Sequence, residues 1–231
     1  MKKPYIKKFA KISEFTVWIV NGKYIRGEID EEFTNCGQYY EFKFIPKKEI
    51  WIDKERVPGE EKYYIDSMLV MNRLMTKGVN HKEAVKRANA IEKRERAKSG
   101  LINNIIKSKK KKEEFIKIIH KKILKRYSSN VKVWIVKGEI VRDLFFIDFT
   151  EGGHDKVYSF IPSGEVWIDD DISRNEIKFI LLHELHERKL MSKGMNYDSA
   201  HKKSSEIEYY CRHYPKKLND KLKEEIEKNR I

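Results

Sequence analysis

One predicted helix carries a histidine and a glutamate with the spacing of metal ligands. The segment Phe179–Leu190 contains His183 and Glu187, four residues apart. Side chains at i and i+4 lie one turn apart on the same helix face, so the pair could bind one ion, as in the H-E-x-x-H helix. Imidazole and carboxylate are both ordinary zinc ligands. Glu184, next to His183, would then be the general base for a metal-activated water.

A third protein ligand is needed, and the next predicted helix supplies candidates. If the chain turns near Met195, the two helices bring Glu187 and His201 nearly level. His201 is therefore the first choice for the third ligand, and Glu206 is the second.

Two further histidines stay open at this point. His186 follows His183 by three residues, so it could ligate the ion or hydrogen-bond to a ligand. His154 follows two glycines and reads equally well as a turn residue or as a partner of the site.

The order of elements around these residues resembles the active-site layout of zincin metallopeptidases. A predicted strand, Glu165–Asp169, precedes the helix with His183-Glu184-Leu-His186-Glu187. The layout is similar in particular to the short gluzincin-like group, in which a sheet, an active-site helix and a second helix supply the site. The resemblance covers this region only, and Glu187 stands where the family has its second histidine. It implies a zinc-dependent hydrolase of peptides or proteins, with Glu184 as base and His183 as first ligand.

All of these residues fall in the second copy of an internal repeat. Val17-Trp-Ile-Val-Asn-Gly recurs as Val133-Trp-Ile-Val-Lys-Gly, and the ungapped offset of 116 gives 28 identities in 76 positions. This similarity predicts a tandem duplication. We expect a first repeat over residues 1–96, a basic linker over 97–130 and a second repeat over 131–231.

Each repeat is predicted to form four strands and then two helices, an α+β fold of ββββαα units. Short β-branched and aromatic runs separated by turn residues indicate an antiparallel meander; in the first repeat they are Val17–Val20, Tyr24–Ile29, Tyr39–Ile45 and Glu49–Asp53. In the second repeat, Ser173–Glu176 has the pattern of a capping box, and Gly194 is placed to end the helix that it opens. Gly78 holds the same place in the first repeat. A helical hairpin follows, with its second helix starting near Asn196.

The repeats differ at the residues that could do chemistry. The first repeat has Gln38, Ser67, Met68, Val70, Met71, Val85 and Ala90 where the second has His154, His183, Glu184, His186, Glu187, His201 and Glu206. We therefore expect metal chemistry in the second repeat alone, with the first as a non-catalytic scaffold or docking domain.

The net charge of +14 lies mainly outside the repeats. The segment Lys93–Lys132 carries a net charge of +12, whereas Val133–Glu208 carries −5. Within the linker, Glu113–Tyr127 is predicted as a basic amphipathic helix. The stretch Lys109–Arg126 could contact nucleic acid or another polyanion without reading sequence. The alternative function is thus a non-enzymatic binding or scaffold protein with a structural metal site and this basic linker.

Other classes are excluded by what the sequence lacks. Two cysteines, Cys36 and Cys211, provide neither a disulfide framework nor a zinc ribbon. No apolar run approaches the length of a membrane-spanning helix. The first residues lack the apolar stretch of a secretory signal, so we expect a cytoplasmic protein. The sequence has no phosphate-binding glycine loop and no Gly-x-Ser-x-Gly nucleophile.

Overall fold

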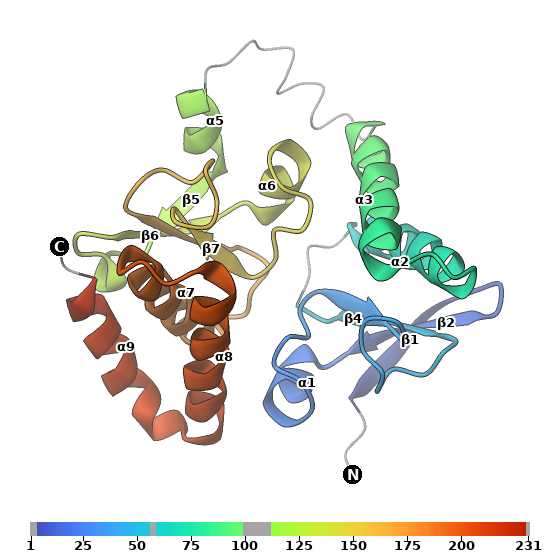
Figure 1. Ribbon diagram of the computed structural model, residues 1–231, viewed down its shortest axis with the longest axis horizontal. Coiled ribbons are helices and arrows are strands. Elements are labelled where there is room, and N and C mark those ends of the chain that lie inside the picture. The colour runs from blue at the N-terminus through green and yellow to red at the C-terminus, as the bar shows by residue number, and fades with distance from the viewer. Residues whose placement is uncertain (1–3, 56–58, 99–111, 230–231) are drawn as a thin grey trace.

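The computed structural model describes residues 4–55, 59–98 and 112–229, which form two units lying side by side (Figure 1). Each unit combines a four-stranded sheet with helices, so the fold is α+β, as predicted. Among the described residues, no helix has the length and apolar character needed to cross a membrane.

The N-terminal unit contains the sheet β1-β2-β4-β3. Its strands are β1 (Tyr5–Ile12), β2 (Phe15–Val20), β3 (Cys36–Gln38) and β4 (Glu49–Asp53). Its helices are α1 (Gly22–Glu28), α2 (Glu61–Thr76) and α3 (His81–Lys98). Strands β2 and β4 run parallel, whereas β1 and β3 pair antiparallel with their neighbours.

The C-terminal unit has the corresponding strand order, β5-β6-β8-β7, again with its two central strands parallel. Its strands are β5 (His120–Ile123), β6 (Lys132–Val136), β7 (Gly152–His154) and β8 (Glu165–Asp169). Its helices are α5 (Lys112–Ile119), η1 (Lys125–Tyr127), α6 (Gly138–Leu144), α7 (Ile177–Ser192), α8 (Tyr197–His213), η2 (Pro215–Lys217) and α9 (Leu218–Lys228). The registers also correspond, since Trp18 lies opposite Trp51 and Trp134 opposite Trp167.

The predicted antiparallel meander is wrong, and the first reason is α1. The segment 24–29 is predicted as a strand, but residues 24–28 belong to this helix and Ile29 is its C-cap, because the Asn21 side chain caps the helix by accepting a hydrogen bond from the Tyr24 amide. The Gly22 amide donates to Asp53 at 3.2 Å, and a Cβ at Gly22 would overlap that carboxylate. The Asn-Gly pair therefore begins a helix instead of turning a hairpin.

The second reason is the aromatic segment 39–45. It was predicted as a strand, but it forms turns between β3 and β4. The rings of Phe42 and Phe33 pack at a tilt with their centroids 5.4 Å apart, and the ring centroids of Phe44 and Trp51 are 5.9 Å apart. These rings cover one face of the sheet, so the aromatic run reflects burial in a loop and not strand pairing. The strands predicted at 17–20 and 49–53 correspond to β2 and β4, but they pair in parallel.

The predicted helix 113–127 is correct only in its first half. α5 ends at Ile119, and β5 follows as the edge strand of the second sheet, with Ile123 opposite Trp134. Pairing with β6 supplies backbone hydrogen bonds that override the helical periodicity. The second sheet thus extends into the range 97–130 predicted as a linker, of which residues 99–111 lie outside the described residues.

The predicted capping box does not form. α7 begins at Ile177, not at Ser173, and the residue before it, Glu176, makes no side-chain cap. Its carboxylate instead accepts a hydrogen bond from Arg212 at 2.7 Å. The buried ion pair therefore takes the place of the cap.

The helical hairpins agree with the prediction. Gly194 and Gly78 have φ of 88° and 82°, the left-handed conformation that glycine adopts without strain. Asn196 and Asn80 each accept a hydrogen bond from the amide three residues ahead. These turns set the level at which the two helices of each hairpin face each other.

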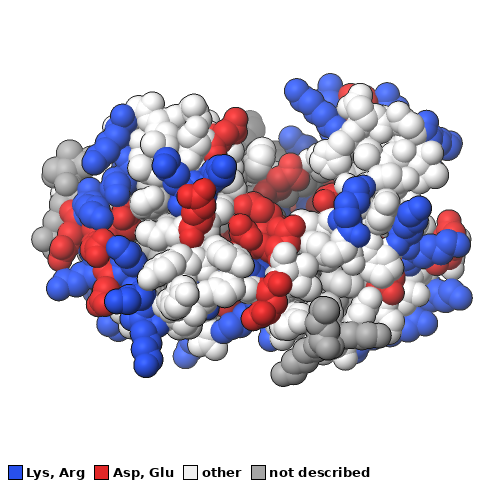
Figure 2. All heavy atoms as spheres, turned by 60° about the horizontal axis from the view of Figure 1, so that its bottom comes forward, with Lys and Arg blue, Asp and Glu red and all other residues white. Residues whose placement is uncertain are grey.

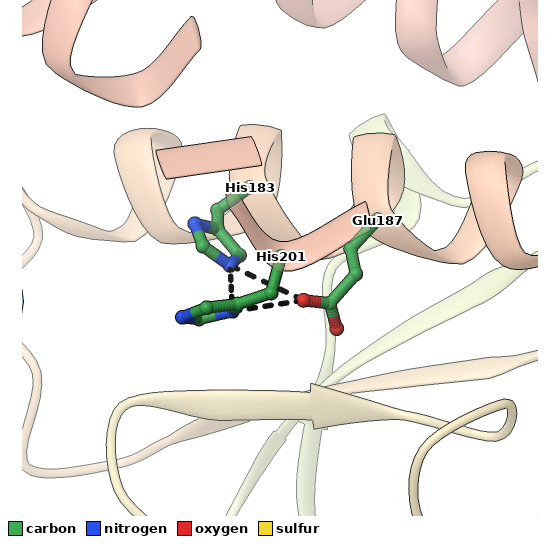
Figure 3. A group of neighbouring side chains, drawn as sticks. All are labelled: His183, Glu187 and His201. Carbon is green, nitrogen blue, oxygen red and sulfur yellow. Dashed lines mark hydrogen bonds and ion pairs between the residues drawn. The ribbon is translucent and has the colours of Figure 1, made fainter. Parts of the chain in front are cut away.

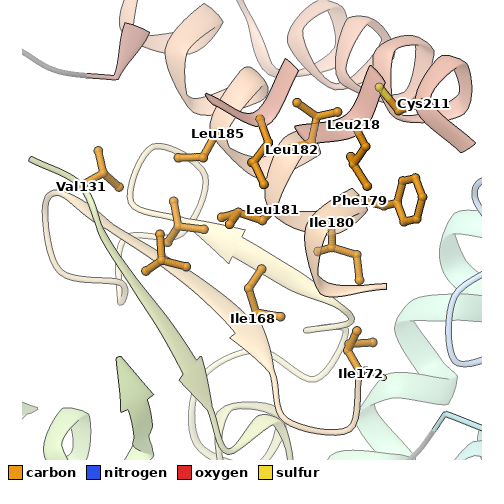
Figure 4. Packing of buried hydrophobic residues seen from close by; sticks show 13 residues of the cluster. Val131, Ile168, Ile172, Phe179, Ile180, Leu181, Leu182, Leu185, Cys211 and Leu218 are labelled. Carbon is orange, nitrogen blue, oxygen red and sulfur yellow. The ribbon is translucent and has the colours of Figure 1, made fainter. Parts of the chain in front are cut away.

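The largest core lies between the second sheet and α7, α8 and α9 (Figure 4). It is built from Val131, Val133, Val166, Ile168, Ile172, Phe179, Ile180, Leu181, Leu182, Leu185, Cys211, Leu218 and Leu222. The other face of the same sheet is covered by α5, α6 and aromatic loop residues. Because both faces are covered, β8 is buried along its whole length. α7 is thereby held rigidly against the sheet.

Two buried glutamates join the units. Glu60 accepts hydrogen bonds at 2.6 and 3.1 Å from Arg142 of the C-terminal unit. In the reverse direction, Arg26 of the N-terminal unit lies 3.5 Å from Glu176, which also pairs with Arg212. All five side chains are buried. Since a buried charge is costly without its partner, these pairs fix how the units sit together.

Candidate metal centre

Helices α7 and α8 bring three of the predicted ligands together (Figure 3). His201 Nδ1 lies 2.9 Å from Glu187 Oε2 and 3.2 Å from His183 Nε2. The remaining separation, from His183 Nε2 to Glu187 Oε2, is 3.6 Å. The hairpin thus does bring Glu187 and His201 level, and its residues could hold one metal ion.

The spacing of these atoms fits a tetrahedral ion. Zinc bonds of ~2.0–2.1 Å place the ligand atoms of a tetrahedron about 3.3–3.4 Å apart. The three observed separations, 2.9, 3.2 and 3.6 Å, bracket that value. Two imidazole nitrogens and one carboxylate oxygen are also a typical zinc ligand set, with one position left for water or substrate.

Carboxylates fix which ring nitrogens carry protons. His183 Nδ1 lies 3.1 Å from Glu208, and His201 Nε2 lies 3.3 Å from Glu32. A carboxylate can only accept, so these two outer nitrogens are the donors. The inner nitrogens face Glu187, another carboxylate, so without a metal they donate to it as well. A metal bound between the three residues would replace those inner protons, while the outer nitrogens would keep theirs. This is the arrangement of metal-bound histidines whose second nitrogen is hydrogen-bonded to a carboxylate.

The same reasoning assigns His154 a different role. His154 is fully buried, and its Nε2 lies 3.0 Å from Glu187 Oε1. Its Nδ1 accepts a hydrogen bond from the Lys156 amide at 3.1 Å, so the proton of the neutral ring is on Nε2. Although His154, Glu184 and Glu187 also lie close enough for a metal group, His154 has no lone pair directed at it. It donates to Glu187 and orients the carboxylate.

The charges of the cluster favour a cation. Burial opposes ionisation of Glu187, but hydrogen bonds from His154, His183 and His201 hold its pKa well below its usual range. Hydrogen bonds with Glu187 and Glu32 raise the pKa of His201 to about 9. Burial disfavours a charged His183, yet its bonds to Glu187 and Glu208 hold its pKa well above the ordinary value. Without a metal, protons therefore occupy the space between the three ligand atoms.

Glu184 borders a cavity beside the ligands. The cavity has a volume of about 130 Å³ and is lined by residues of both units, among them Tyr158 and Tyr197. Gly152 permits the approach of the sheet to α7, because a Cβ there would come within 3.3 Å of Glu184 Cγ. Burial raises the pKa of the Glu184 carboxyl to about 8, and a nearby divalent cation would act in the opposite direction. A carboxyl whose pKa lies near the working pH is suited to proton transfer at neutral pH.

The lining of this cavity is acidic. No Lys or Arg is among its described lining residues. Six glutamates are: Glu31, Glu32, Glu151, Glu184, Glu187 and Glu208. Acidic side chains also gather between the two units on the face shown in Figure 2, while Lys and Arg dominate its outer flanks. Because glutamates outnumber the two histidines in this lining, the cleft favours cations.

Two predicted site residues lie elsewhere. His186 Nδ1 is 3.1 Å from Glu225 of α9, outside the cavity, so it is neither a ligand nor a partner of one. Glu206 is exposed and does not line the cavity. On α7 the face toward the site carries His183, and on α8 it carries His201. His186 and Glu206 lie on other faces of these helices.

Three residues of the site were missed by the sequence reasoning. Glu208 lies seven residues after His201, two helical turns on, and this spacing was a usable signal. A comparison of the repeats does not single it out, because Glu92 matches it in the first repeat. Glu32, far away in the sequence, gave no signal, and Ser205, which donates to Glu32 at 2.9 Å, gave none without it.

The N-terminal unit has a corresponding cavity without the ligands. It measures about 200 Å³, and its lining contains the four residues aligned with the ligands and base: Ser67, Met68, Met71 and Val85. Two methionines and a valine offer no hard ligand for a divalent ion. Of the two corresponding positions, the one in the C-terminal unit is where the described residues include a group that could hold a metal ion.

The predicted basic stretch Lys109–Arg126 is only partly described. Lys109, Lys110 and Lys111 lie outside the described residues. From Lys117 onward the cations of the stretch are exposed but are distributed over α5, β5 and η1, not along one helix, and Lys121 pairs with Asp170 at 2.8 Å. Contact with a polyanion stays a prediction.

No protein-family model matches the chain, and no curated protein or solved structure gives a significant match. The resemblance to zincin metallopeptidases therefore stays a prediction that depends on the motif of α7 and the order of the elements around it.

Proposed function

We propose that the protein is a zinc-dependent hydrolase whose ion is held by His183, Glu187 and His201, with Glu184 as general base. The observation that carries the proposal is the convergence of three potential ligand atoms within 3.6 Å, with both outer ring nitrogens bonded to carboxylates. The acidic lining, which attracts a cation, supports it further.

A zinc ion held there would supply Lewis-acid polarisation of a substrate carbonyl and of a water molecule. The residues of the chain would do the rest. Glu184 would take a proton from the attacking water and pass it to the leaving group. His154 would keep Glu187 oriented. A peptide or protein is the proposed substrate, with the carbonyl placed in the cavity beside Tyr158 and Tyr197.

Zinc stoichiometry tests the site. The full chain, stripped with a chelator and then exposed to zinc, should retain one equivalent through gel filtration. His183→Ala and His201→Ala should weaken zinc binding by more than about 100-fold, since loss of a residue that only orients a ligand already costs roughly 10–100-fold.

His186→Ala and Glu206→Ala are the matched controls, because each removes a predicted candidate that lies outside the cavity. Both should bind one equivalent. A wild-type chain that retains no zinc would refute the proposal, and an equal loss in the His186→Ala variant would place the ion elsewhere.

The affinity for zinc should depend on pH over an unusually high range. A proton and the metal compete for His201 Nδ1, and the pKa of His201 is about 9 without the metal. Affinity should therefore keep rising, by about tenfold per pH unit for each proton displaced, from pH 6 to about 9. Competition with a chromophoric chelator measures this. A plateau above pH 6.5 would show that the proton does not occupy the ligand position.

We also infer that the chain arose by tandem duplication of one α+β unit. The offset of 116 relates the two sheets, the two hairpins and the two cavities. Loss of the ligands from the first copy would have left its cavity filled with methionine and valine while its fold was kept.

A further inference from the structure

We propose that Glu32 of the N-terminal unit is a positioning residue of the metal centre, so that the centre is complete only across both units. This inference rests on the proposed function, because it concerns the ligand His201. It assigns the N-terminal unit a direct part in metal binding, beyond that of a scaffold.

Glu32 reaches the site from the loop between α1 and β3. Its Oε2 lies 3.3 Å from His201 Nε2, and its Oε1 accepts a hydrogen bond from Ser205 at 2.9 Å. Ser205 lies one turn after His201 on α8, so the two side chains can each contact a different oxygen of the Glu32 carboxylate. Through Glu32 the N-terminal unit contacts the proposed metal ligand His201, although the Glu32 side chain is 53% exposed.

The contact decides which nitrogen of His201 faces the metal. A neutral imidazole carries its proton on either nitrogen. The Glu32 carboxylate accepts from Nε2, so a ring that has given up one proton to bind the metal keeps its other proton on Nε2 and directs the lone pair of Nδ1, the atom 2.9 Å from Glu187, toward the ion. His183 obtains the same orientation from Glu208 within its own unit. Without Glu32, His201 has no described partner that holds its proton on the outer nitrogen.

The fold provides a matched control. At the position 116 residues after Glu32, Asp148 makes the reverse contact, accepting from Asn89 of α3 at 2.8 and 3.0 Å. Asn89 corresponds to Ser205. This contact also joins the two units, but the cavity beside it has no metal ligands. Removing Asp148 therefore removes an equivalent contact between the units without changing the environment of a ligand.

The experiment measures the affinity of full-length variants for zinc alone, by competition with a chromophoric chelator. Glu32→Ala should raise the dissociation constant for zinc by roughly 10–100-fold, as expected for a carboxylate that orients a ligand. Glu32→Gln should lose less, because its amide oxygen still accepts from Nε2 but carries no charge. Asp148→Ala should stay within about twofold of the wild type.

Urea unfolding of the metal-free proteins separates positioning from stability. Both alanine variants should unfold at closely similar urea concentrations, since each loses a carboxylate that accepts two hydrogen bonds from the other unit. The inference would be overturned if Glu32→Ala bound zinc as tightly as the wild type, or if Asp148→Ala lost as much zinc affinity as Glu32→Ala. Either result would leave the proposed function intact. A wild-type chain that binds no zinc would overturn both.

Discussion

An Arg142→Met variant is expected to lose about 3–5 kcal/mol of unfolding free energy, the cost of leaving buried partners unpaired. Arg142 is fully buried, donates twice to Glu60 of the other unit and pairs with Asp169 of its own. It also donates to the Phe149 carbonyl at 3.0 Å. Methionine matches the length of the side chain but leaves Asp169 without its cation and removes one of the two arginines that pair with Glu60, the other being Arg96. Urea unfolding monitored by tryptophan fluorescence measures the loss.

Two comparisons make this result specific. Arg142→Lys keeps the charge but cannot direct donors at three acceptors, so its stability should lie between those of the wild type and the methionine variant. Arg87→Met removes an exposed pair with Glu83 and should change stability by no more than about 0.5 kcal/mol. Equal stability of the Arg142→Met and Arg87→Met variants would show that the buried pairs do not hold the units together.

The sequence predicted the parts of the fold that depend on local patterns. The strands at 17–20 and 49–53, the turns at Gly78 and Gly194, and the helical hairpins follow from β-branched runs and from glycine at positive φ. Pairing was not predictable in this way. Whether β2 and β4 run parallel depends on α1, and the Asn-Gly pair before α1 fits a hairpin turn as well as a helix cap.

The site was predictable to the extent that it lies on one hairpin. The spacing of His183, Glu187 and His201 within α7 and α8 is fixed by helical geometry, and the structure brings these three together. Glu32 was not predictable, because no periodicity links it to a helix that starts 165 residues later, at Tyr197. Comparing the repeats identified the ligands that differ, but it concealed Glu208, which both repeats keep.

Glu184→Gln is expected to stop hydrolysis while leaving zinc bound. The Glu184 carboxylate borders the cavity beside the ligand atoms, and within the described part of the chain it makes no hydrogen bond of its own. It is therefore free to take a proton from water. Glutamine has the same shape but no basicity, so hydrolysis of a peptide library should fall by about 10²-fold or more. Zinc affinity should change little, because the three ligands remain.

The comparison with His183→Ala and Glu206→Gln decides between a catalytic and a structural metal. His183→Ala should lose both zinc and hydrolysis, whereas Glu206→Gln, at an exposed position of α8, should keep both. Glu184→Gln, with zinc bound but hydrolysis lost, would show the pattern expected of a general base. If Glu184→Gln instead hydrolyses peptides as fast as the wild type, Glu184 has no part in proton transfer. If the zinc-loaded wild type hydrolyses nothing in the library, the ion supports the fold, and the non-enzymatic alternative with a structural metal site is favoured.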